Sequence, residues 1–147
     1  MAERQNFFEA VLIIVLKDNQ VLLQKRKNTG WMDGWYDVPS GHVERGETIL
    51  NAAVREVDEE TGLKAAPDDL ELIHISQADT DKVYTYFIFK VRRWEGRPNL
   101  REPDMAEELG FHPLNHLPDK IPPYTKSGLD NLNSSAVTFS YFGADKF

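Results

Sequence analysis

Four carboxylates stand within five consecutive residues near the middle of this chain: Glu56, Asp58, Glu59 and Glu60. Apolar residues just before them recur at three- and four-residue spacing, which is typical of an amphipathic helix. At about 100° per residue the three glutamates fall within an arc of roughly 100° beside the apolar face, whereas Asp58 points elsewhere. Hard oxygen donors in this number suit Mg²⁺ or Mn²⁺.

These acids are unfavourably placed for the helix itself. The C-terminal end of a helix carries partial negative charge, so each exposed acid there costs roughly 0.3–1 kcal/mol. Glu56 and Glu60 also repel each other at i, i+4 spacing. A bound divalent cation would convert this repulsion into shared ligation. The alternative is a solvated acidic face, which is the usual meaning of such clusters.

The loop before the helix favours the metal interpretation. Pro39-Ser40-Gly41 and Gly46 frame a tight turn in which a free backbone carbonyl could face a metal. Glu47 precedes Arg55 by eight residues. We therefore expect Arg55 to reach back and hold the loop through a charge-assisted, bidentate contact.

The elements that position these residues follow from the local pattern. A helix is expected from Thr48, with Gly62-Leu63 as its stop. Before it, Phe8–Lys17 and Val21–Lys25 predict a hairpin, and Trp35–Val38 predicts a short strand stopped by Pro39-Ser40-Gly41.

After the helix, Leu70–Ser76 and Val83–Trp94 predict a second hairpin around Asp79-Thr80-Asp81. The proline-rich stretch Pro98–Pro123 is expected to be mostly loop and a candidate lid, with a short strand near Glu108–Pro113. Tyr124–Leu132 is expected to form a closing helix, with Ile121 and Leu129 or Leu132 facing inward.

Length and composition indicate one domain over residues 1–147, with a mixed sheet and packed helices, in the α/β or α+β class. The net charge of −7 argues against a nucleic-acid-binding surface, and no apolar run approaches the roughly 20 residues of a membrane span. The absence of cysteine leaves only oxygen or nitrogen donors for a metal. No secretory signal is apparent, so a cytoplasmic location is expected.

Residues 41–63, GHVERGETILNAAVREVDEETGL, match the Nudix box throughout, and the chain resembles the MutT-like members of the Nudix hydrolase family. The resemblance implies an α/β/α sandwich and Mg²⁺-dependent hydrolysis of a nucleoside diphosphate linked to a further group. The matching positions are Gly41, Glu47, Arg55, Glu56, Val57, Glu59, Glu60, Gly62 and Leu63.

The resemblance also implies residue roles. Glu56, Glu59, Glu60 and the Gly41 carbonyl would bind the metal, while Glu47 and Arg55 would brace the loop and helix. The base that activates water varies in this family; the alternatives here are Glu56, Glu59, Glu102 and Glu107. Ser40 stands where many relatives carry a second glycine, outside the box proper.

Outside the box, Arg26 occupies a position where relatives that cleave nucleoside triphosphates place a phosphate-binding arginine. With Lys25 and Lys27 it is equally explained as a solvated strand end. Trp35, like its neighbours Trp31 and Tyr36, is a candidate for stacking on a base, with ordinary core packing as the alternative. The four histidines have no metal-ligand spacing.

Three functions remain open from the sequence. The favoured one is hydrolysis of a nucleoside triphosphate, normal or oxidised, to monophosphate and pyrophosphate. The second is hydrolysis of a nucleotide sugar, a dinucleoside polyphosphate or another phosphorylated metabolite. The third is a non-catalytic nucleotide-sensing module, which the intact set of box carboxylates disfavours. The partner is then a small nucleotide, and both a monomer and a homodimer remain open.

Overall fold

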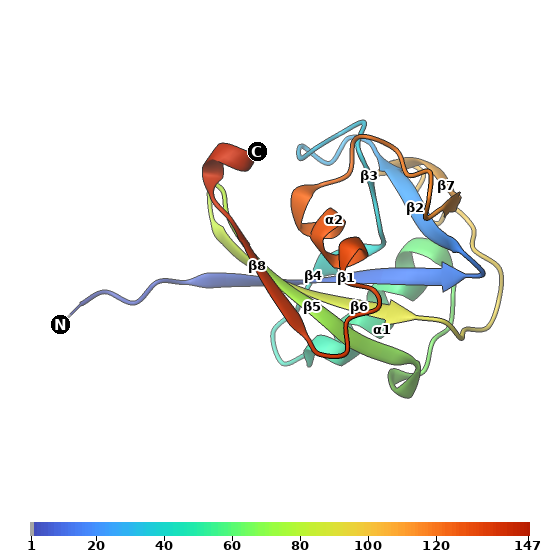
Figure 1. Cartoon of the computed structure of the whole chain (residues 1–147), viewed down its shortest axis with the longest axis horizontal. Coiled ribbons are helices and arrows are strands. Elements are labelled where there is room, and N and C mark those ends of the chain that lie inside the picture. Colours follow the sequence, from blue (N-terminus) through green and yellow to red (C-terminus); the bar gives the residue numbers. More distant parts are fainter. Residues whose placement is uncertain (1) are drawn as a thin grey trace.

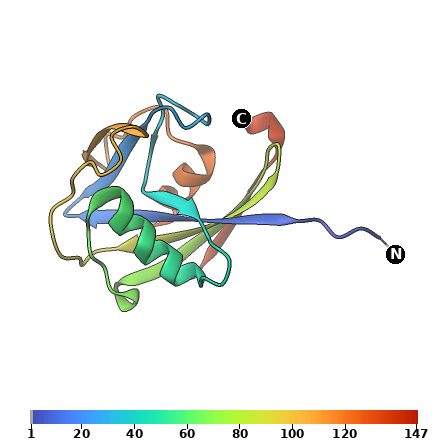
Figure 2. The ribbon, with the colours of Figure 1, turned by 180° about the vertical axis from the view of Figure 1, so that it is seen from behind.

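A single long strand, β1 (Phe7–Lys17), forms the centre of the computed structural model, which describes residues 2–147. Its side chains alternate between two apolar clusters, as expected for a strand buried on both faces. One cluster contains Leu12 and Ile14 and packs against α2 (Pro123–Asp130). The other contains Val11 and Ile13 and packs against α1 (Ile49–Thr61). The two helices therefore cover opposite faces of the sheet (Figures 1 and 2), and the predicted α/β/α sandwich is confirmed.

The sheet is mixed, with the order β3-β2-β1-β6-β5-β8. In addition, β4 pairs with β1 and β7 pairs with β2. The strand β1 runs parallel to β6 over a long register, from Phe7↔Val83 to Val15↔Val91. The other strands are β2 (Gln20–Arg26), β3 (Tyr36–Asp37), β4 (Ser40–His42), β5 (Leu70–Asp79), β6 (Val83–Val91), β7 (Ala106–Pro113) and β8 (Thr138–Phe142). Short 3-10 turns span Pro67–Asp69 and Ala144–Lys146.

The two strands of the first hairpin separate soon after their turn. Their register contains only Leu16↔Val21 and Lys17↔Gln20. Beyond this point β4 pairs with β1, while β3 and β7 pair with β2. The sheet thus divides into two parts that diverge from the turn, and the space between them holds the cavity described below.

Both helices agree closely with the sequence-based prediction. The N-cap of α1 is Thr48, whose Oγ1 accepts from Asn51 N at 3.1 Å. Its C-cap is Gly62, with φ of 79° and its N–H donating to Asp58 O at 2.7 Å. The expected inward residues of the closing helix, Ile121, Leu129 and Leu132, are all buried.

Several strand boundaries differ from the prediction. Ser40-Gly41 was expected to stop a strand, but Ser40–His42 forms β4 against β1. The predicted Trp35–Val38 strand is confined to Tyr36–Asp37, β5 extends to Asp79, β6 ends at Val91, and β7 begins at Ala106. The strand β8 was not predicted. These segments are strands because of pairing with distant partners, which local pattern does not encode. No helix within residues 2–147 is long and apolar enough to cross a bilayer.

Candidate active site

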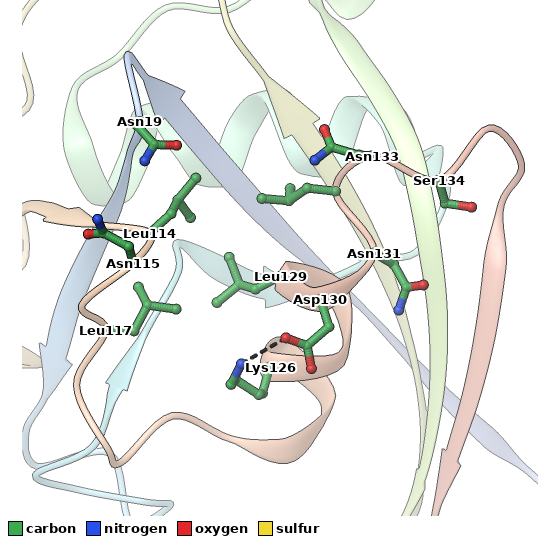
Figure 3. Close-up of a pocket in the computed structure, with 11 residues that line it drawn as sticks. Asn19, Leu114, Asn115, Leu117, Lys126, Leu129, Asp130, Asn131, Asn133 and Ser134 are labelled. Atoms are coloured by element: carbon green, nitrogen blue, oxygen red, sulfur yellow. Dashed lines mark hydrogen bonds and ion pairs between the residues drawn. The ribbon is translucent and has the colours of Figure 1, made fainter.

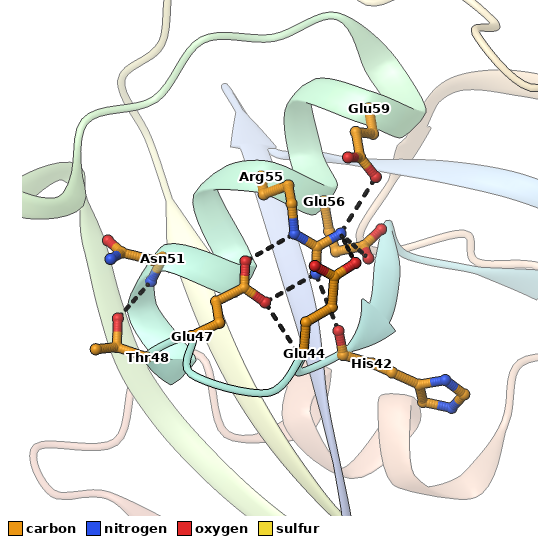
Figure 4. Close-up of polar contacts among 8 residues, drawn as sticks. All are labelled: His42, Glu44, Glu47, Thr48, Asn51, Arg55, Glu56 and Glu59. Atoms are coloured by element: carbon orange, nitrogen blue, oxygen red, sulfur yellow. Dashed lines mark hydrogen bonds and ion pairs between the residues drawn. The ribbon is translucent and has the colours of Figure 1, made fainter.

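Arg55 joins the loop after β4 to helix α1 (Figure 4). Its Nε and Nη2 donate to Glu47 Oε2 and Oε1 at 2.7 and 2.9 Å, a bidentate geometry. Nη2 also donates to the His42 carbonyl at 3.0 Å. Hydrogen bonding from Arg55 lowers the pKa of Glu47 to about 2, so this carboxylate stays ionised at neutral pH. The contact expected from the eight-residue spacing is therefore present.

The third guanidinium nitrogen of Arg55 faces the acidic end of the helix. Nη1 donates to Glu56 Oε1 at 2.7 Å and to Glu59 Oε2 at 3.2 Å. This single cation offsets part of the repulsion among the helix acids. Even so, burial raises the pKa of Glu56, and the charges of Glu59 and Glu102 raise it further.

Gly41 lies directly against the carboxylate of Glu56. A Cβ added at Gly41 would stand 2.0 Å from Glu56 Cδ and 2.0 Å from Oε1, far inside van der Waals contact. Glycine is therefore required at this position by close approach rather than by its backbone conformation. The Glu56 side chain, 12% exposed, is confined between the loop and Arg55.

Glu60 points from the helix into the space between β2 and β4. Its Oε2 accepts from Gln24 Nε2 at 2.6 Å and from Ser40 N at 3.1 Å. Burial raises the pKa of Glu60 well above its usual range, and the negative charge of Glu56 raises it further. Glu60 is thus a carboxylate for which an additional positive charge would be strongly favourable.

The ladder between β1 and β4 fixes the direction of each carbonyl in the loop. Ile13 N donates to Pro39 O at 2.9 Å, and Val43 N donates to Glu9 O at 3.0 Å. Hydrogen-bonded and non-hydrogen-bonded pairs alternate along an antiparallel ladder. The pair midway between these two bonds is therefore also a hydrogen-bonded pair.

That midway pair is Val11↔Gly41, so the Gly41 carbonyl faces Val11 on β1. The backbone of Ser40 faces the opposite side, where its N–H donates to Glu60 Oε2. The carbonyl of Ser40 lies on the same side as its N–H. The carbonyl of Gly41, which the sequence predicted to face a metal, thus points to β1, whereas the carbonyl of Ser40 lies on the side of Glu60.

The donor set fits a divalent cation. Glu56, Glu60 and the Ser40 carbonyl offer hard oxygen atoms, and burial together with neighbouring negative charge raises the pKa of both acids. Glu59 is more exposed to solvent than Glu56: its side chain is 53% exposed and forms an ion pair with Arg55. Within residues 2–147 no three acidic or histidine side chains already converge as a closed cage.

A cavity of about 570 Å³ opens between the two diverging parts of the sheet. Glu60 and Glu102 line it beside Ser40 and Gly41, so one end is acidic. Aromatic side chains gather elsewhere on its wall. They are Trp31, Tyr84, Tyr86 and Tyr124.

Arg26 and Trp31 lie on this cavity, but Trp35, Tyr36 and Glu107 are not among its lining residues within the described chain. Tyr36 instead donates to Glu108 Oε2 at 2.6 Å. Trp35 lies just before β3, at the end of the loop that carries Trp31. The aromatic predicted to stack is therefore replaced at the cavity by Trp31.

Arg26 also orders the loop that carries Trp31. Its Nε donates to the Trp31 carbonyl at 2.8 Å and its Nη2 to Thr29 Oγ1 at 3.1 Å. Its lysine neighbours turn away, Lys25 to Glu107 at 3.3 Å and Lys27 to the Pro103 carbonyl at 3.3 Å. The solvated-strand-end interpretation thus describes the lysines, whereas Arg26 faces the cavity.

Sequence reasoning missed four residues on or beside this site: Gln24, Asp37, Tyr86 and Tyr124. Asp37 and Gln24 are polar residues paired across β3 and β2 and buried there. A lone polar residue within an apolar strand was the available signal for both. The two tyrosines carried no signal in the sequence, because aromatic residues on strands and helices usually belong to the core.

A second cavity, of about 520 Å³, lies beside α2 and contains none of the predicted site residues. The ion pair between Lys126 and Asp130, at 2.7 Å, lies on its wall (Figure 3). Its remaining lining residues are leucine, asparagine and serine side chains.

A family model described as "NUDIX domain" matches residues 6–132 of the chain. The match covers most of the molecule, including both helices and the acidic end of the cavity. The chain therefore belongs to the Nudix family, as residues 41–63 predicted. Within that family it is a MutT-like Nudix hydrolase.

Known proteins similar to the chain support this placement. The "8-oxo-dGTP diphosphatase" of Escherichia coli is 32% identical over 115 residues, which cover 78% of this chain and 86% of that protein. The "ADP-ribose pyrophosphatase" of Methanocaldococcus jannaschii is 40% identical over 109 residues, covering 71% of this chain and 61% of its relative. The crystal structure of a MutT NUDIX hydrolase from Burkholderia pseudomallei matches with a TM-score of 0.81 at 23% identity. The match covers 88% of this chain and 100% of that protein's chain. This last likeness shows the shared fold.

Proposed function

We propose that this Nudix hydrolase uses Mg²⁺, with Mn²⁺ as a substitute, to cleave a nucleoside triphosphate to monophosphate and pyrophosphate. The substrate is a normal or oxidised nucleotide. One observation carries the proposal: a charge-deficient acidic site at Glu56 and Glu60 adjoins a cavity whose wall carries Tyr86 and Tyr124. Such a cavity suits a ligand with a polyphosphate at one end and a flat base at the other. The name of the Escherichia coli relative supports the same class of substrate.

Each site residue then has a distinct part. Glu56, Glu60 and the Ser40 carbonyl would hold the cation, and Arg55, fixed by Glu47, orients Glu56. When bound, the cation supplies positive charge to the phosphate oxygens and lowers the pKa of a bound water. Because the reacting phosphates are anionic, this neutralisation is essential beside so many carboxylates.

We infer that the proton of the attacking water goes to one of three carboxylates: Glu56, Glu59 or Glu102. Glu102 lines the cavity, and Glu59 is within reach of solvent. Glu107 pairs with Lys25 outside the cavity, so we do not assign it this part. Arg26 faces the cavity and is placed to bind a phosphate oxygen once the loop contacts to Thr29 and Trp31 are exchanged.

A second candidate substrate is ADP-ribose or another nucleotide sugar. The printed name of the 40%-identical relative from Methanocaldococcus jannaschii favours it. The acidic site and its cation would serve both substrates, so only the group beyond the diphosphate differs. A substrate panel separates the two.

The test is to incubate the purified chain with Mg²⁺ and nucleoside triphosphates, oxidised nucleotides, ADP-ribose, nucleotide sugars and dinucleoside polyphosphates. All products are separated by anion-exchange chromatography, with and without chelator, because ADP-ribose and nucleotide sugars yield a nucleoside monophosphate and a sugar phosphate instead of pyrophosphate. We expect chelator-sensitive release of pyrophosphate from a triphosphate. Turnover of ADP-ribose alone would establish the second candidate, and no turnover of any compound would favour the nucleotide-sensing module.

Glu56→Gln and Glu60→Gln test the site itself. Each is expected to lower kcat by about 10²-fold or more, in line with loss of a preorganised electrostatic group. Each should leave the fold intact or slightly more stable, because a carboxylate with a raised pKa is removed. Asp58→Asn is the matched control, since Asp58 lies on the same helix but pairs with Lys64 away from the site. Near-normal turnover in either glutamine variant would remove that residue from the site.

A further inference from the structure

The Trp31 loop, residues 28–34, joins β2 to β3 and forms one wall of the active-site cavity. Its backbone is left-handed at every second residue. These residues are Asn28, Gly30, Met32 and Gly34, with φ of 55°, 79°, 50° and 83°. Glycine adopts this conformation readily, but it is unfavourable for a residue with a long side chain such as Met32. Contacts with the rest of the molecule therefore have to hold the loop in its place.

The Trp31 loop is tied to β2 on one side and to α2 on the other. On the β2 side, Arg26 donates to the Trp31 carbonyl at 2.8 Å and to Thr29 Oγ1 at 3.1 Å. On the α2 side, Trp31 Nε1 donates to Tyr124 Oη at 3.1 Å. The first tie is lost when Arg26 turns to bind a phosphate, as the proposed function requires. The loop then depends on the contacts of the Trp31 side chain.

Phe147 completes an aromatic cluster around this side chain. Its ring centroid lies 5.8 Å from that of Trp31 and 6.0 Å from that of Tyr124, within the range of favourable aromatic pairs. Phe147 is 38% exposed and is not among the lining residues of the cavity within the described chain. It therefore packs against two aromatic residues of the cavity wall without reaching the cavity itself.

The segment that carries Phe147 is fixed to the sheet before it reaches the Trp31 loop. Strand β8 runs parallel to β5 along its whole length. The 3-10 turn Ala144–Lys146 follows, and Phe147 N donates to the Ala144 carbonyl at 3.3 Å. Figures 1 and 2 show the chain turning from β8 toward the loop between β2 and β3. This segment lies beyond residues 6–132, so its contact with the Trp31 loop is an addition to the part that the family model matches.

We propose that Phe147 is a positioning residue that holds the Trp31 loop closed over the active-site cavity while Arg26 binds phosphate. It keeps the indole of Trp31 against Tyr124, so the wall stays in place after Arg26 has exchanged its loop contacts for the substrate. Because Phe147 lies outside the cavity, it acts on every nucleotide alike and contributes no preference for a base. The inference rests on the proposed phosphate-binding part of Arg26.

Chymotrypsin reports opening of the loop without any turnover, because it cleaves after aromatic residues and Trp31 lies within the loop. The rate of such cleavage follows the population of the open form. In Phe147→Ala, cleavage between Trp31 and Met32, followed by mass spectrometry, should be about 2- to 10-fold faster, as expected for loss of an aromatic pair. Phe147→Tyr keeps the ring and should be digested like wild type. Phe139→Ala is the matched control, because Phe139 is 65% exposed on β8 and lies outside the cluster.

Pyrophosphate tests the connection with Arg26. It is a product of the proposed reaction and occupies Arg26 without being a nucleotide. In wild type, Phe147 then holds the loop alone, whereas in Phe147→Ala both ties are weakened. The ratio of cleavage rates, variant over wild type, should therefore be larger with pyrophosphate than without it. An equal or smaller ratio would show that Arg26 and Phe147 do not share the loop.

Kinetics test the effect on the reaction. With Mg²⁺ and dGTP, dATP or dCTP, KM should rise by about 2- to 10-fold in Phe147→Ala, while kcat stays within a few-fold of wild type. The rise should be the same for each nucleotide, and Phe147→Tyr should abolish it. A merely structural role would instead lower kcat together with the temperature of thermal unfolding.

The digestion separates failure of this inference from failure of the proposed function. An unchanged cleavage rate in Phe147→Ala overturns the inference whatever the chain hydrolyses. An unchanged KM, or a lower kcat alone, overturns it where triphosphates are hydrolysed. If no triphosphate is hydrolysed, the proposed function fails, and the two digestions, with and without pyrophosphate, decide the part of Phe147 by themselves.

Discussion

At Gly41, the missing side chain determines where the carboxylate of Glu56 can lie. The Nudix pattern predicted a glycine with a role at this position, and the sequence linked that role to its carbonyl. The close approach of Glu56 gives a different reason. The carbonyl direction depends on the register of β4 against β1, and a shift of one residue reverses it. Composition and spacing do not determine that register, so the side on which the Ser40 carbonyl lies could not be predicted from them.

Gly41→Ala should therefore inactivate the enzyme with little effect on the fold. The new Cβ would fall 2.0 Å from Glu56 Cδ, so the Glu56 side chain must move away from its contact with Arg55. Displacements of about 1 Å at a reacting centre cost on the order of 10²-fold in rate. Turnover of the best panel substrate and thermal unfolding are the measurements. Gly110→Ala is the control, because no atom lies within 4 Å of a Cβ built there. Activity within a few-fold of wild type in Gly41→Ala would contradict the geometry.

Helix α1 and strand β4 show which elements could be predicted from sequence. The helix is specified by local signals: the apolar spacing, the Thr48 cap and the Gly62 stop all lie within the element or next to it. The contact between Arg55 and Glu47 follows because both residues flank the first turns of that helix. Strands β4 and β8 depend on pairing with β1 and β5, far along the chain. Their short, mixed sequences carry no strong periodicity, so tertiary pairing alone makes them strands.

The N-cap of α1 gives a direct test of local specification. Thr48→Ala removes the acceptor for Asn51 N and should lower the free energy of unfolding by about 0.5–2 kcal/mol. Urea denaturation measures the change. Thr48→Ser keeps the hydroxyl and should recover most of the loss. If the serine variant were as unstable as the alanine variant, packing of the threonine methyl group, rather than capping, would explain the effect.

For the whole molecule, the decisive feature is the divergence of β1 and β2 after their turn. It creates the cavity and brings Asp37, Arg26 and Trp31 toward the helix carboxylates. The sequence predicted the hairpin but not that its strands would acquire different partners. The substrate end of the site was therefore harder to predict than the metal end, because its residues come from many separate strands, loops and α2. The metal end comes mainly from one continuous segment, residues 41–63.

The opposite edge of the sheet is held by a buried polar cluster around His74. Its Nδ1 contacts Thr138 Oγ1 at 2.6 Å, while Nε2 contacts Ser140 Oγ at 2.8 Å and Ser127 Oγ at 3.0 Å. These hydroxyls belong to β8 and α2, so one imidazole from β5 joins both elements to the central sheet. Burial lowers the pKa of His74 below its usual value of 6.5, which means that the folded state favours the neutral ring.

Acidification should therefore destabilise the molecule through His74. A group whose pKa is lowered on folding contributes its full stabilisation above the unfolded pKa, near 6.5, and loses it as the pH falls through the folded pKa. We expect the free energy of unfolding to decrease more between pH 7.5 and 5 in wild type than in His74→Gln, which cannot gain a proton. Urea denaturation at several pH values measures both curves.

The comparison isolates His74 because the other shifted acids are present in both proteins. The raised pKa of Asp37 acts in the opposite direction, since protonation of that buried carboxyl stabilises the fold as the pH falls toward 4. The lowered pKa of Glu47 removes stability only below its ordinary value of 4.5. Both contributions cancel in the difference between the two curves. Parallel curves would show that His74 keeps its neutral form or its partners throughout, and that the β8 edge is held by apolar packing instead.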